Sequence, residues 1–395
     1  MSALELTASE AVHLPYGRVR DRHGRDIAGV RMGPDLVDLA SFLDGGMLAD
    51  LFARARLEPF LAAGPQVWAD VRGAVLDAVR SGADARLERS LHPLADTTEL
   101  MPFDVADYVD FYASRDHASN IGRILRPDGP PLSANWEHMP VGYHGRAGTV
   151  VVSGTPVTRP SGQARNPDGS ICVGPSTRLD FEAEVGFVVG VGSSLGTSIG
   201  VDNFRSHVFG ACLVNDWSAR DIQAWEYVPL GPFLGKSFAT SIAAWITPLD
   251  ALAAAWVHPP TRNQQVESYL DDEGRNDALD LQLTVELNTT VVSSPPFASM
   301  YWTPAQMLAH MTVNGARLRT GDLYASGTVS GARADECGSL MELSRNGEQP
   351  VMTGRGPRGF LADGDTVVIR ATAPSSAGHA GSIALGEVSG QIAGR

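Results

Sequence analysis

The chain has 395 residues, 43% of them hydrophobic, and 45 acidic residues against 31 lysines and arginines give it a formal net charge of −14. This length exceeds what one compact core usually holds and predicts two domains, while the negative charge argues against a nucleic-acid-binding protein. The 42 glycines and 25 prolines predict many turns and a strand-rich fold.

The chain shows no targeting or redox signal. Its first ten residues lack a basic stretch followed by an apolar run, and no segment offers about 18 uninterrupted apolar residues. We therefore expect a cytoplasmic protein without a membrane partner. Three cysteines far apart, with no CxxC motif, predict small core residues rather than a disulfide framework or a zinc site; they are Cys172, Cys212 and Cys337.

The first hundred residues predict strands followed by helices. Short apolar segments separated by turns predict hairpin strands over 14–39. Helices are predicted over 47–63 and 66–89, the second with a core-facing row of valines at Val67, Val71, Val75 and Val79.

A linker is predicted over 92–102, where prolines punctuate the chain. We therefore expect a small N-terminal domain over 1–100 and a larger domain over 101–395.

The stretch 107–146 is rich in carboxylates, histidines, tyrosines and arginines, with glycines and prolines that turn loops. On an extended segment Asp110 and Tyr112 point to the same face. Ser114 predicts the N-cap of a helix, which places His117 in its first turn, close to Asp110. Taken alone, this pair is better explained by a turn-capping aspartate and a satisfied surface histidine. The composition of the whole stretch favours a site.

A predicted strand over 179–189 alternates strictly, so that Asp180, Glu182 and Glu184 share one face. Carboxylates two apart on a strand lie about 6.5–7 Å from each other and raise each other's pKa unless a cation lies among them. A solvated outer face is the alternative interpretation. Without sulfur or imidazole ligands nearby, a metal here would be Ca²⁺, Mg²⁺ or Mn²⁺ rather than zinc.

A buried strand predicted over 208–214 leads to Asp216, a position typical of a ligand or catalytic group and equally of a helix cap. The glycine-rich segments 190–196 and 231–237 have the wrong spacing for nucleotide-binding loops. Lys236 nevertheless stands among glycines and apolar residues, where desolvation would make it a strong donor to an oxyanion.

Toward the C-terminus, a capping box at Thr303 predicts a helix to about residue 313. A strand over 323–331 runs into a hydroxyl-rich loop suited to binding a carboxylate. In an apolar strand predicted over 338–344, Glu342 is the one acid and needs a partner, for which His117 is a candidate. A closing strand is predicted over 366–369.

Five motifs together resemble the fumarylacetoacetase (fumarylacetoacetate hydrolase) family: DYVDFYASRDHA, PVGYHGR, NDWSARDIQ, WEYVPLGPFLGKSF and SGTVSG, which begin at residues 107, 140, 215, 225 and 326. The resemblance covers nearly the whole chain and is weakest in the N-terminal helices and after about residue 370. It implies a β-rich α+β fold with a small N-terminal SH3-like β domain and a larger catalytic mixed β-roll, assembled as a homodimer.

The resemblance further implies a metal-dependent hydrolase that cleaves a carbon–carbon bond of 4-fumarylacetoacetate to give fumarate and acetoacetate, the last step of tyrosine and phenylalanine catabolism. It implies a Ca²⁺ site from Asp110, Glu182, Glu184 and Asp216. It implies a second site, for Mg²⁺ or a monovalent cation, near Asp216, Lys236 and Thr240.

The same resemblance implies roles for the remaining site residues. His117 would be a general base oriented by Glu342. The oxyanion would be stabilised by Arg220, Gln223 and Lys236. Substrate contacts are expected from Tyr112, Arg126, Tyr143, Gln223, Tyr227 and Thr328. Glu137 departs from the apolar residue typical of the family at that position.

Two other functions compete with this one. A relative of the same superfold could act on another 1,3-diketo acid, as an acylpyruvate hydrolase or a decarboxylase–isomerase, but the Tyr143 loop and the segment 227–236 favour fumarylacetoacetate. A non-catalytic calcium-binding module would give His117 and Lys236 no reason to converge.

Overall fold

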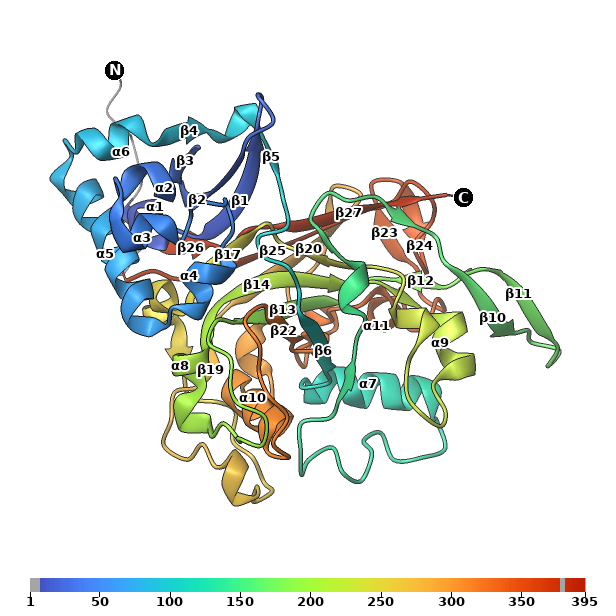
Figure 1. The fold of residues 1–395 in the computed structure, drawn as a ribbon. Helices are drawn as coiled ribbons and strands as arrows, with labels where there is room; N and C mark the ends of the chain where they lie inside the picture. The colour runs from blue at the N-terminus through green and yellow to red at the C-terminus, as the bar shows by residue number, and fades with distance from the viewer. Residues whose placement is uncertain (1–7, 377–380, 395) are drawn as a thin grey trace.

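The computed structural model describes residues 8–376 and 381–394 and shows a strand-rich molecule with its N-terminal helices gathered beside the first strands (Figure 1). Three N-terminal strands form an antiparallel meander, as predicted: β1 (Tyr16–Asp21), β2 (Asp26–Met32) and β3 (Asp35–Asp38). The linker predicted over 92–102 is partly wrong, because this region supplies two short strands that pair with β3 and β1: β4 (Leu91–Pro93) and β5 (Thr97–Glu99).

The N-terminal helices are shorter than predicted. They are α1 (Ala8–His13), α2 (Leu39–Phe42), α3 (Gly46–Asp50), α4 (Glu58–Ala62), α5 (Pro65–Ser81) and α6 (Ala85–Arg89). The helix expected over 47–63 is interrupted where Ala55 adopts a φ of 51°, and the helix expected over 66–89 is broken at Gly82, whose φ is 68°. The valine row does face the core, since Val71 and Val75 are fully buried.

These N-terminal strands continue into a 13-stranded mixed sheet. Its path runs β4-β3-β2-β1-β17-β14-β13-β22-β6-β7, with β16 and β8 attached through β14. The added strands are β6 (Asp107–Phe111), β7 (Gly142–His144), β8 (Val150–Val152), β13 (Ala183–Val189), β14 (Val208–Asp216), β16 (Thr240–Ile242), β17 (Trp245–Pro248) and β22 (Asp322–Ala325). The joint is made by β1 and β17, where Tyr16 lies opposite Ile246.

Aromatic packing strengthens that joint. Tyr16 stacks on Phe60 with ring centroids 5.1 Å apart, and both rings meet the edge of Phe209, which also contacts Trp68. One hydrophobic cluster therefore includes residues from both halves of the chain.

A second sheet lies against β14 of the first, so the C-terminal region is built in layers (Figure 1). It has the order β21-β20-β25-β27-β9 with β26 on β25. Its strands are β9 (Val157–Thr158), β20 (Gln282–Leu287), β21 (Thr290–Ser293), β25 (Thr366–Pro374), β26 (Ser382–Ala384) and β27 (Val388–Ala393). The closing strand is thus confirmed, and of the C-terminal segment that matches the family loosely, 377–380 and 395 lie outside the described residues.

Short two-stranded ladders complete the fold: β10 (Ser161–Arg165) with β11 (Ile171–Pro175), β12 (Leu179–Asp180) with β15 (Ser218–Ala219), β18 (Trp256–Val257) with β19 (Ala278–Leu279), and β23 (Val351–Thr353) with β24 (Gly356–Arg358). The first of these is a hairpin of half-buried and exposed residues. This hairpin projects from the body of the molecule (Figure 1), and Ile171 and Val173 of its second strand are exposed.

The later helices are α7 (Arg115–Leu125), α8 (Phe204–His207), α9 (Arg220–Glu226), α10 (Pro304–Thr312) and α11 (Leu340–Leu343), with 3₁₀ turns at Leu94–Asp96, Ala147–Thr149, Val201–Asn203, Leu234–Lys236, Leu249–Ala255, Ser268–Leu270, Phe297–Ser299 and Ala334–Glu336. The capping box at Thr303 is confirmed. The strand predicted over 338–344 is wrong, because Ser339 caps the one-turn helix α11 there.

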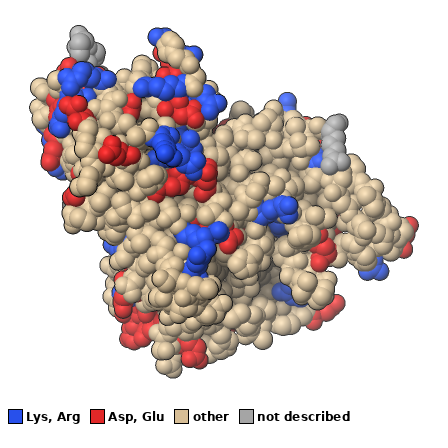
Figure 2. Space-filling view, in the orientation of Figure 1, with Lys and Arg blue, Asp and Glu red and all other residues tan. Residues whose placement is uncertain are grey.

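The structure shows where the charged residues and the cysteines lie. On the face seen in Figure 2, positive and negative side chains are intermixed over the N-terminal region, and most of the remaining surface is uncharged. Cys212 and Cys337 are buried as predicted, whereas Cys172 is half-buried on β11 and is not a core residue. No helix within 8–376 and 381–394 is both long and apolar enough to cross a membrane.

Candidate active site

Four carboxylates meet near the ends of neighbouring strands in the large sheet. Asp216 ends β14, Glu184 lies near the start of the antiparallel neighbour β13, Glu182 precedes that strand, and Asp110 lies at the end of β6. Each offers an oxygen, and these oxygens all lie within 4.8 Å of one another. All four side chains are buried, so the solvated-face interpretation is wrong, and Asp216 is not a helix cap because α9 begins four residues later.

The cluster is electrostatically strained without a cation. Among the described residues, Oδ1 of Asp110 and both carboxylate oxygens of Glu184 accept no hydrogen bond. Burial raises the pKa of both carboxyl groups well above the usual value, and repulsion from Asp216 raises the pKa of each further. Glu182 differs: burial alone would raise its pKa, but the charges of Lys236 and Arg220 outweigh burial and lower it.

Two cationic side chains line the same acids. Lys236 donates to Asp216 Oδ2 at 2.6 Å and also to Glu182. Arg220, the first residue of α9, donates to Glu182 at 2.7 Å and to Asp180 at 2.8 Å. Five buried carboxylates, these three together with Asp110 and Glu184, thus face two positive charges from the arginines and lysines of the described chain. The residual negative charge is what a divalent cation would neutralise.

Asp180 does not join the cluster, contrary to the strict alternation predicted over 179–189. The strand is interrupted between β12 and β13, and Asp180 instead accepts hydrogen bonds from Arg220 and from the backbone N–H groups of Leu340 and Met341 at the start of α11. It is therefore a buried anchor for the arginine and for a helix end.

Thr240 and Tyr143 complete the surroundings of Asp216. Thr240 Oγ1 donates to Asp216 Oδ1 at 2.9 Å, and the Tyr143 hydroxyl donates to Oδ2 at 3.2 Å. The three residues predicted to lie near a second cation, Asp216, Lys236 and Thr240, are thus neighbours, and the lysine ammonium donates to the Asp216 carboxylate.

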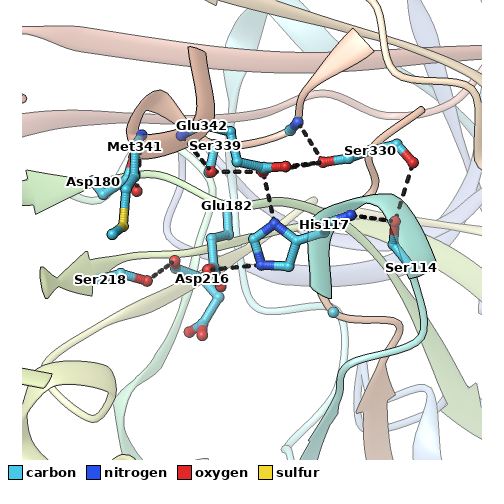
Figure 3. Close-up of polar contacts among 12 residues, drawn as sticks. Ser114, His117, Asp180, Glu182, Asp216, Ser218, Ser330, Ser339, Met341 and Glu342 are labelled. Carbon is cyan, nitrogen blue, oxygen red and sulfur yellow. Dashed lines mark hydrogen bonds and ion pairs between the residues drawn. The ribbon is translucent and has the colours of Figure 1, made fainter. Parts of the chain in front are cut away.

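His117 and Glu342 form the buried pair that the sequence suggested (Figure 3). Ser114 caps α7 by accepting from the backbone N–H of His117 at 3.1 Å. His117 Nδ1 lies 2.6 Å from Glu342 Oε2, and Nε2 lies 3.7 Å from Glu182. Burial would raise the pKa of Glu342, but the charge of His117 and the hydrogen bonds it receives lower it. An ionised Glu342 places the proton on Nδ1 and leaves Nε2 as the basic nitrogen.

A cavity of about 350 Å³ opens above these groups. Of the residues predicted to contact substrate or oxyanion, the following line it: Tyr112, Arg126, Tyr143, Arg220, Gln223, Tyr227, Lys236 and Thr328. Thr328 Oγ1 is buried and has no hydrogen-bond partner among the described residues. Gln223 Oε1 accepts from Arg220 at 3.1 Å, and because arginine only donates, the amide N–H groups of Gln223 are left to donate elsewhere.

Arg126 reaches the cavity from the end of α7, with Nη2 donating to the carbonyl of Pro131 at 3.0 Å. That carbonyl lies directly on the helix, since a Cβ at Gly122 would stand 1.8 Å from it. Glu137 pairs with Arg115 at 2.8 Å on the surface and is not among the residues lining the cavity.

Sequence reasoning missed several side chains that hold Glu342. Asn120, Ser330 and Ser339 all donate to its carboxylate. Ser330 lies in the hydroxyl-rich loop that predicted carboxylate binding, but the carboxylate it holds is that of Glu342, within the protein itself. The sequence therefore indicated that this loop binds a carboxylate, but not that the carboxylate belongs to the protein.

Comparison with known proteins decides the family. The family model described as fumarylacetoacetate (FAA) hydrolase C-terminal matches residues 107–392, and the model described as fumarylacetoacetase N-terminal matches 12–102. The chain is 42% identical over 380 residues to the fumarylacetoacetase of Homo sapiens, covering 90% of each chain, and 42% identical to that of Bos taurus, again with 90% of each chain covered. The chain belongs to the fumarylacetoacetase family.

Solved structures support the fold of this fumarylacetoacetase-family member. A fumarylacetoacetate hydrolase from Exiguobacterium antarcticum superimposes with a TM-score of 0.57 at 17% identity, covering 97% of this chain and all of the other. A maleylpyruvate hydrolase from Sphingobium superimposes with a TM-score of 0.53 at 15% identity, with coverage of 97% and 100%. At such identities the likeness shows the shared fold only.

Proposed function

We propose that the protein hydrolyses 4-fumarylacetoacetate to fumarate and acetoacetate, the last step of tyrosine and phenylalanine breakdown. The observation that supports this most strongly is the identity of about 40% to fumarylacetoacetases over 90% of the chain. The likeness to a maleylpyruvate hydrolase is limited to the fold and does not favour another diketo acid.

The buried acids fit a hard divalent cation, because all four offer oxygen ligands and their carboxylates carry excess negative charge. We propose that Asp110, Glu182, Glu184 and Asp216 hold Ca²⁺, which when bound would supply Lewis-acid polarisation of the diketone oxygens. A second cation, Mg²⁺ or a monovalent ion near Asp216, Lys236 and Thr240, stays a prediction.

In the proposed reaction, His117 Nε2 takes a proton from water while Glu342 holds Nδ1–H and stabilises the imidazolium. Hydroxide adds to the carbonyl carbon. After the carbon–carbon bond breaks, the acetoacetate carbanion takes up a proton, which His117 can return.

Other side chains that line the cavity would donate to the oxyanion. Two of the three Lys236 N–H groups are engaged by Glu182 and Asp216, which leaves one for the cavity, beside the Gln223 amide. Arg220 keeps its predicted oxyanion role as a proposal, with three of its five N–H groups already used by Asp180, Glu182 and Gln223. Tyr112, Arg126, Tyr143, Tyr227 and Thr328 would orient the substrate.

The test is an assay of the purified chain with fumarylacetoacetate, following loss of the diketone absorbance and identifying products, before and after chelation and Ca²⁺ addition. Fumarate and acetoacetate formed only with metal would support both the reaction and the cation. Intact substrate in the presence of metal would contradict the substrate assignment, and acylpyruvates would be tried next.

We also propose that the protein is a homodimer. Exposed apolar side chains cluster where the β10–β11 hairpin meets α9, since Trp225 donates to Gln163, the cross-strand neighbour of Val173. Those exposed by 40% or more are Ile171, Val173, Trp225, Val228, Leu230, Phe233 and Leu234. Light scattering is expected to give twice the chain mass of 41.9 kDa, and Val173→Asp with Leu230→Asp to give the monomer. A monomeric wild type would contradict the prediction.

The division into 1–100 and 101–395 likewise stays a proposal, supported by the two family models meeting between residues 102 and 107.

A further inference from the structure

The Glu342 carboxylate is held by more than its histidine partner. His117 Nδ1 and Ser339 Oγ lie 2.6 and 2.8 Å from Oε2, Asn120 Nδ2 lies 2.9 Å from Oε1, and Ser330 Oγ lies 3.1 Å from both oxygens. A carboxylate has about four acceptor sites. Four donors therefore fill the hydrogen-bonding capacity of this buried group and leave it one orientation.

Ser330 is linked to both members of the pair (Figure 3). Its hydroxyl accepts from the backbone N–H of Gly338 at 3.0 Å, so the hydroxyl proton is directed at Glu342. Its carbonyl accepts from Ser114 Oγ at 3.0 Å, and the same Ser114 oxygen caps His117. The loop after β22 thus ties the start of α7 to the carboxylate on α11.

Asn120 is a second donor to Glu342 from α7. It lies three residues after His117, so both side chains project from one face of α7 toward Glu342. Arg123 Nη1 donates to Asn120 Oδ1 at 3.2 Å, and because arginine cannot accept, the amide must present its NH₂ group to the carboxylate.

We propose that Asn120, Ser330 and Ser339 are positioning residues for the His117–Glu342 pair, an inference that rests on the proposed hydrolase function. Their hydrogen bonds stop the carboxylate from rotating about its bond to the chain. Oε2 then stays in line with Nδ1, and the Nε2 lone pair of His117 stays directed at the cavity. Removing one donor would leave a buried acceptor partly unsatisfied and release that constraint.

The experiment uses Asn120→Ala, Ser330→Ala and the double variant of the full chain. Ser339 is left unchanged because it also caps α11. Each single variant is expected to lower kcat by about tenfold to a hundredfold with little change in KM, as the loss of outer supporting hydrogen bonds does elsewhere. The reduction in kcat of the double variant should be smaller than the product of the two single reductions, because both side chains act on the same carboxylate. The far-downfield proton signal of His117 Nδ1–H should shift or broaden in all three.

Ser344→Ala is the matched control. At the other end of α11, its buried hydroxyl donates to the carbonyl of Gly359 at 2.8 Å and accepts from the backbone N–H of Gly347 at 3.0 Å, whereas only the Ser344 backbone bonds to Glu342, at its carbonyl. It should cost stability while leaving kcat and the downfield signal unchanged. Variants at Asn120 and Ser330 with wild-type kcat and an unchanged signal, or losses no greater than that of Ser344→Ala, would overturn the proposal.

The test stays decisive if one variant does not fold, and one outcome separates this inference from the function it rests on. Asn120 is only partly buried, so Asn120→Ala still decides the question if Ser330→Ala does not fold. If the wild type does not turn over fumarylacetoacetate but the Nδ1–H signal still moves in the variants, the positioning role stands and the substrate assignment fails.

Discussion

His117→Ala is expected to abolish measurable turnover while leaving Ca²⁺ affinity nearly intact. A positioned general base contributes about 100- to 10,000-fold to the rate, and among the described residues His117 is the one whose ring pairs with Glu342 below the cavity. His117 does not belong to the cluster of four carboxylates that would bind the metal. Its nearest distance to that cluster is the 3.7 Å between Nε2 and Glu182. Steady-state kinetics would measure kcat, and calorimetric titration would measure Ca²⁺ binding.

His258→Ala serves as the control, because His258 is exposed and its ring makes one hydrogen bond among the described residues, with the carbonyl of Arg275. It should behave as the wild type in both measurements. An alanine variant at His117 that keeps most of its kcat would remove the histidine from the role of base, and one that loses Ca²⁺ binding would show that the ring supports the cluster rather than the chemistry.

Removing the metal is expected to abolish activity and to make stability depend on pH in a particular direction. In the metal-free protein, the raised pKa values of Asp110, Glu184 and Asp216 mean that the folded chain keeps protons which the unfolded chain releases above about pH 4. The folded state then binds more protons, so the free energy of unfolding falls as pH rises. Glu182, whose pKa is lowered, stays ionised in both states over this range and adds no slope.

The melting temperature of the metal-stripped protein should therefore fall from about pH 5 to about pH 8. Added Ca²⁺ should raise the melting temperature most at the higher pH. At a free concentration a hundredfold above Kd, binding adds about 2.7 kcal/mol. Glu184→Gln should flatten the pH slope of the stripped protein and respond less to Ca²⁺. If Ca²⁺ does not change the melting temperature of the wild type at the higher pH, a metal at the cluster is ruled out.

Local patterns predicted the site better than its surroundings. Glu182 and Glu184 followed from period-two alternation, Asp216 from its place at the end of an apolar strand, and the His117 turn from the Ser114 cap. These signals are physical and short-range, and they survive folding. The His117–Glu342 contact, 225 residues apart in sequence, was reachable only because a buried acid needs a partner.

The errors arose where tertiary contacts override local preference. Asp180 keeps the alternation in sequence, but the strand breaks beside it so that Arg220 can bind. The apolar residues around Glu342 are too few to distinguish a strand from one helical turn. The strands over 161–175 were not recognised, because the first strand is polar and the apolar residues of the second, Ile171 and Val173, are exposed instead of packing in the core. Asn120 carries no pattern at all, because its function depends on a glutamate 222 residues away.

The pairing of β1 with β17 has a consequence for how the chain can be divided. Without the first hundred residues, β17 would become an open strand edge, and the ring of Phe209 would lose Tyr16, Phe60 and Trp68. Exposed edges of this kind recruit other chains. The catalytic segment expressed alone should therefore aggregate, since the N-terminal segment, which supplies none of the residues lining the cavity, protects this edge of the catalytic sheet from pairing with other chains.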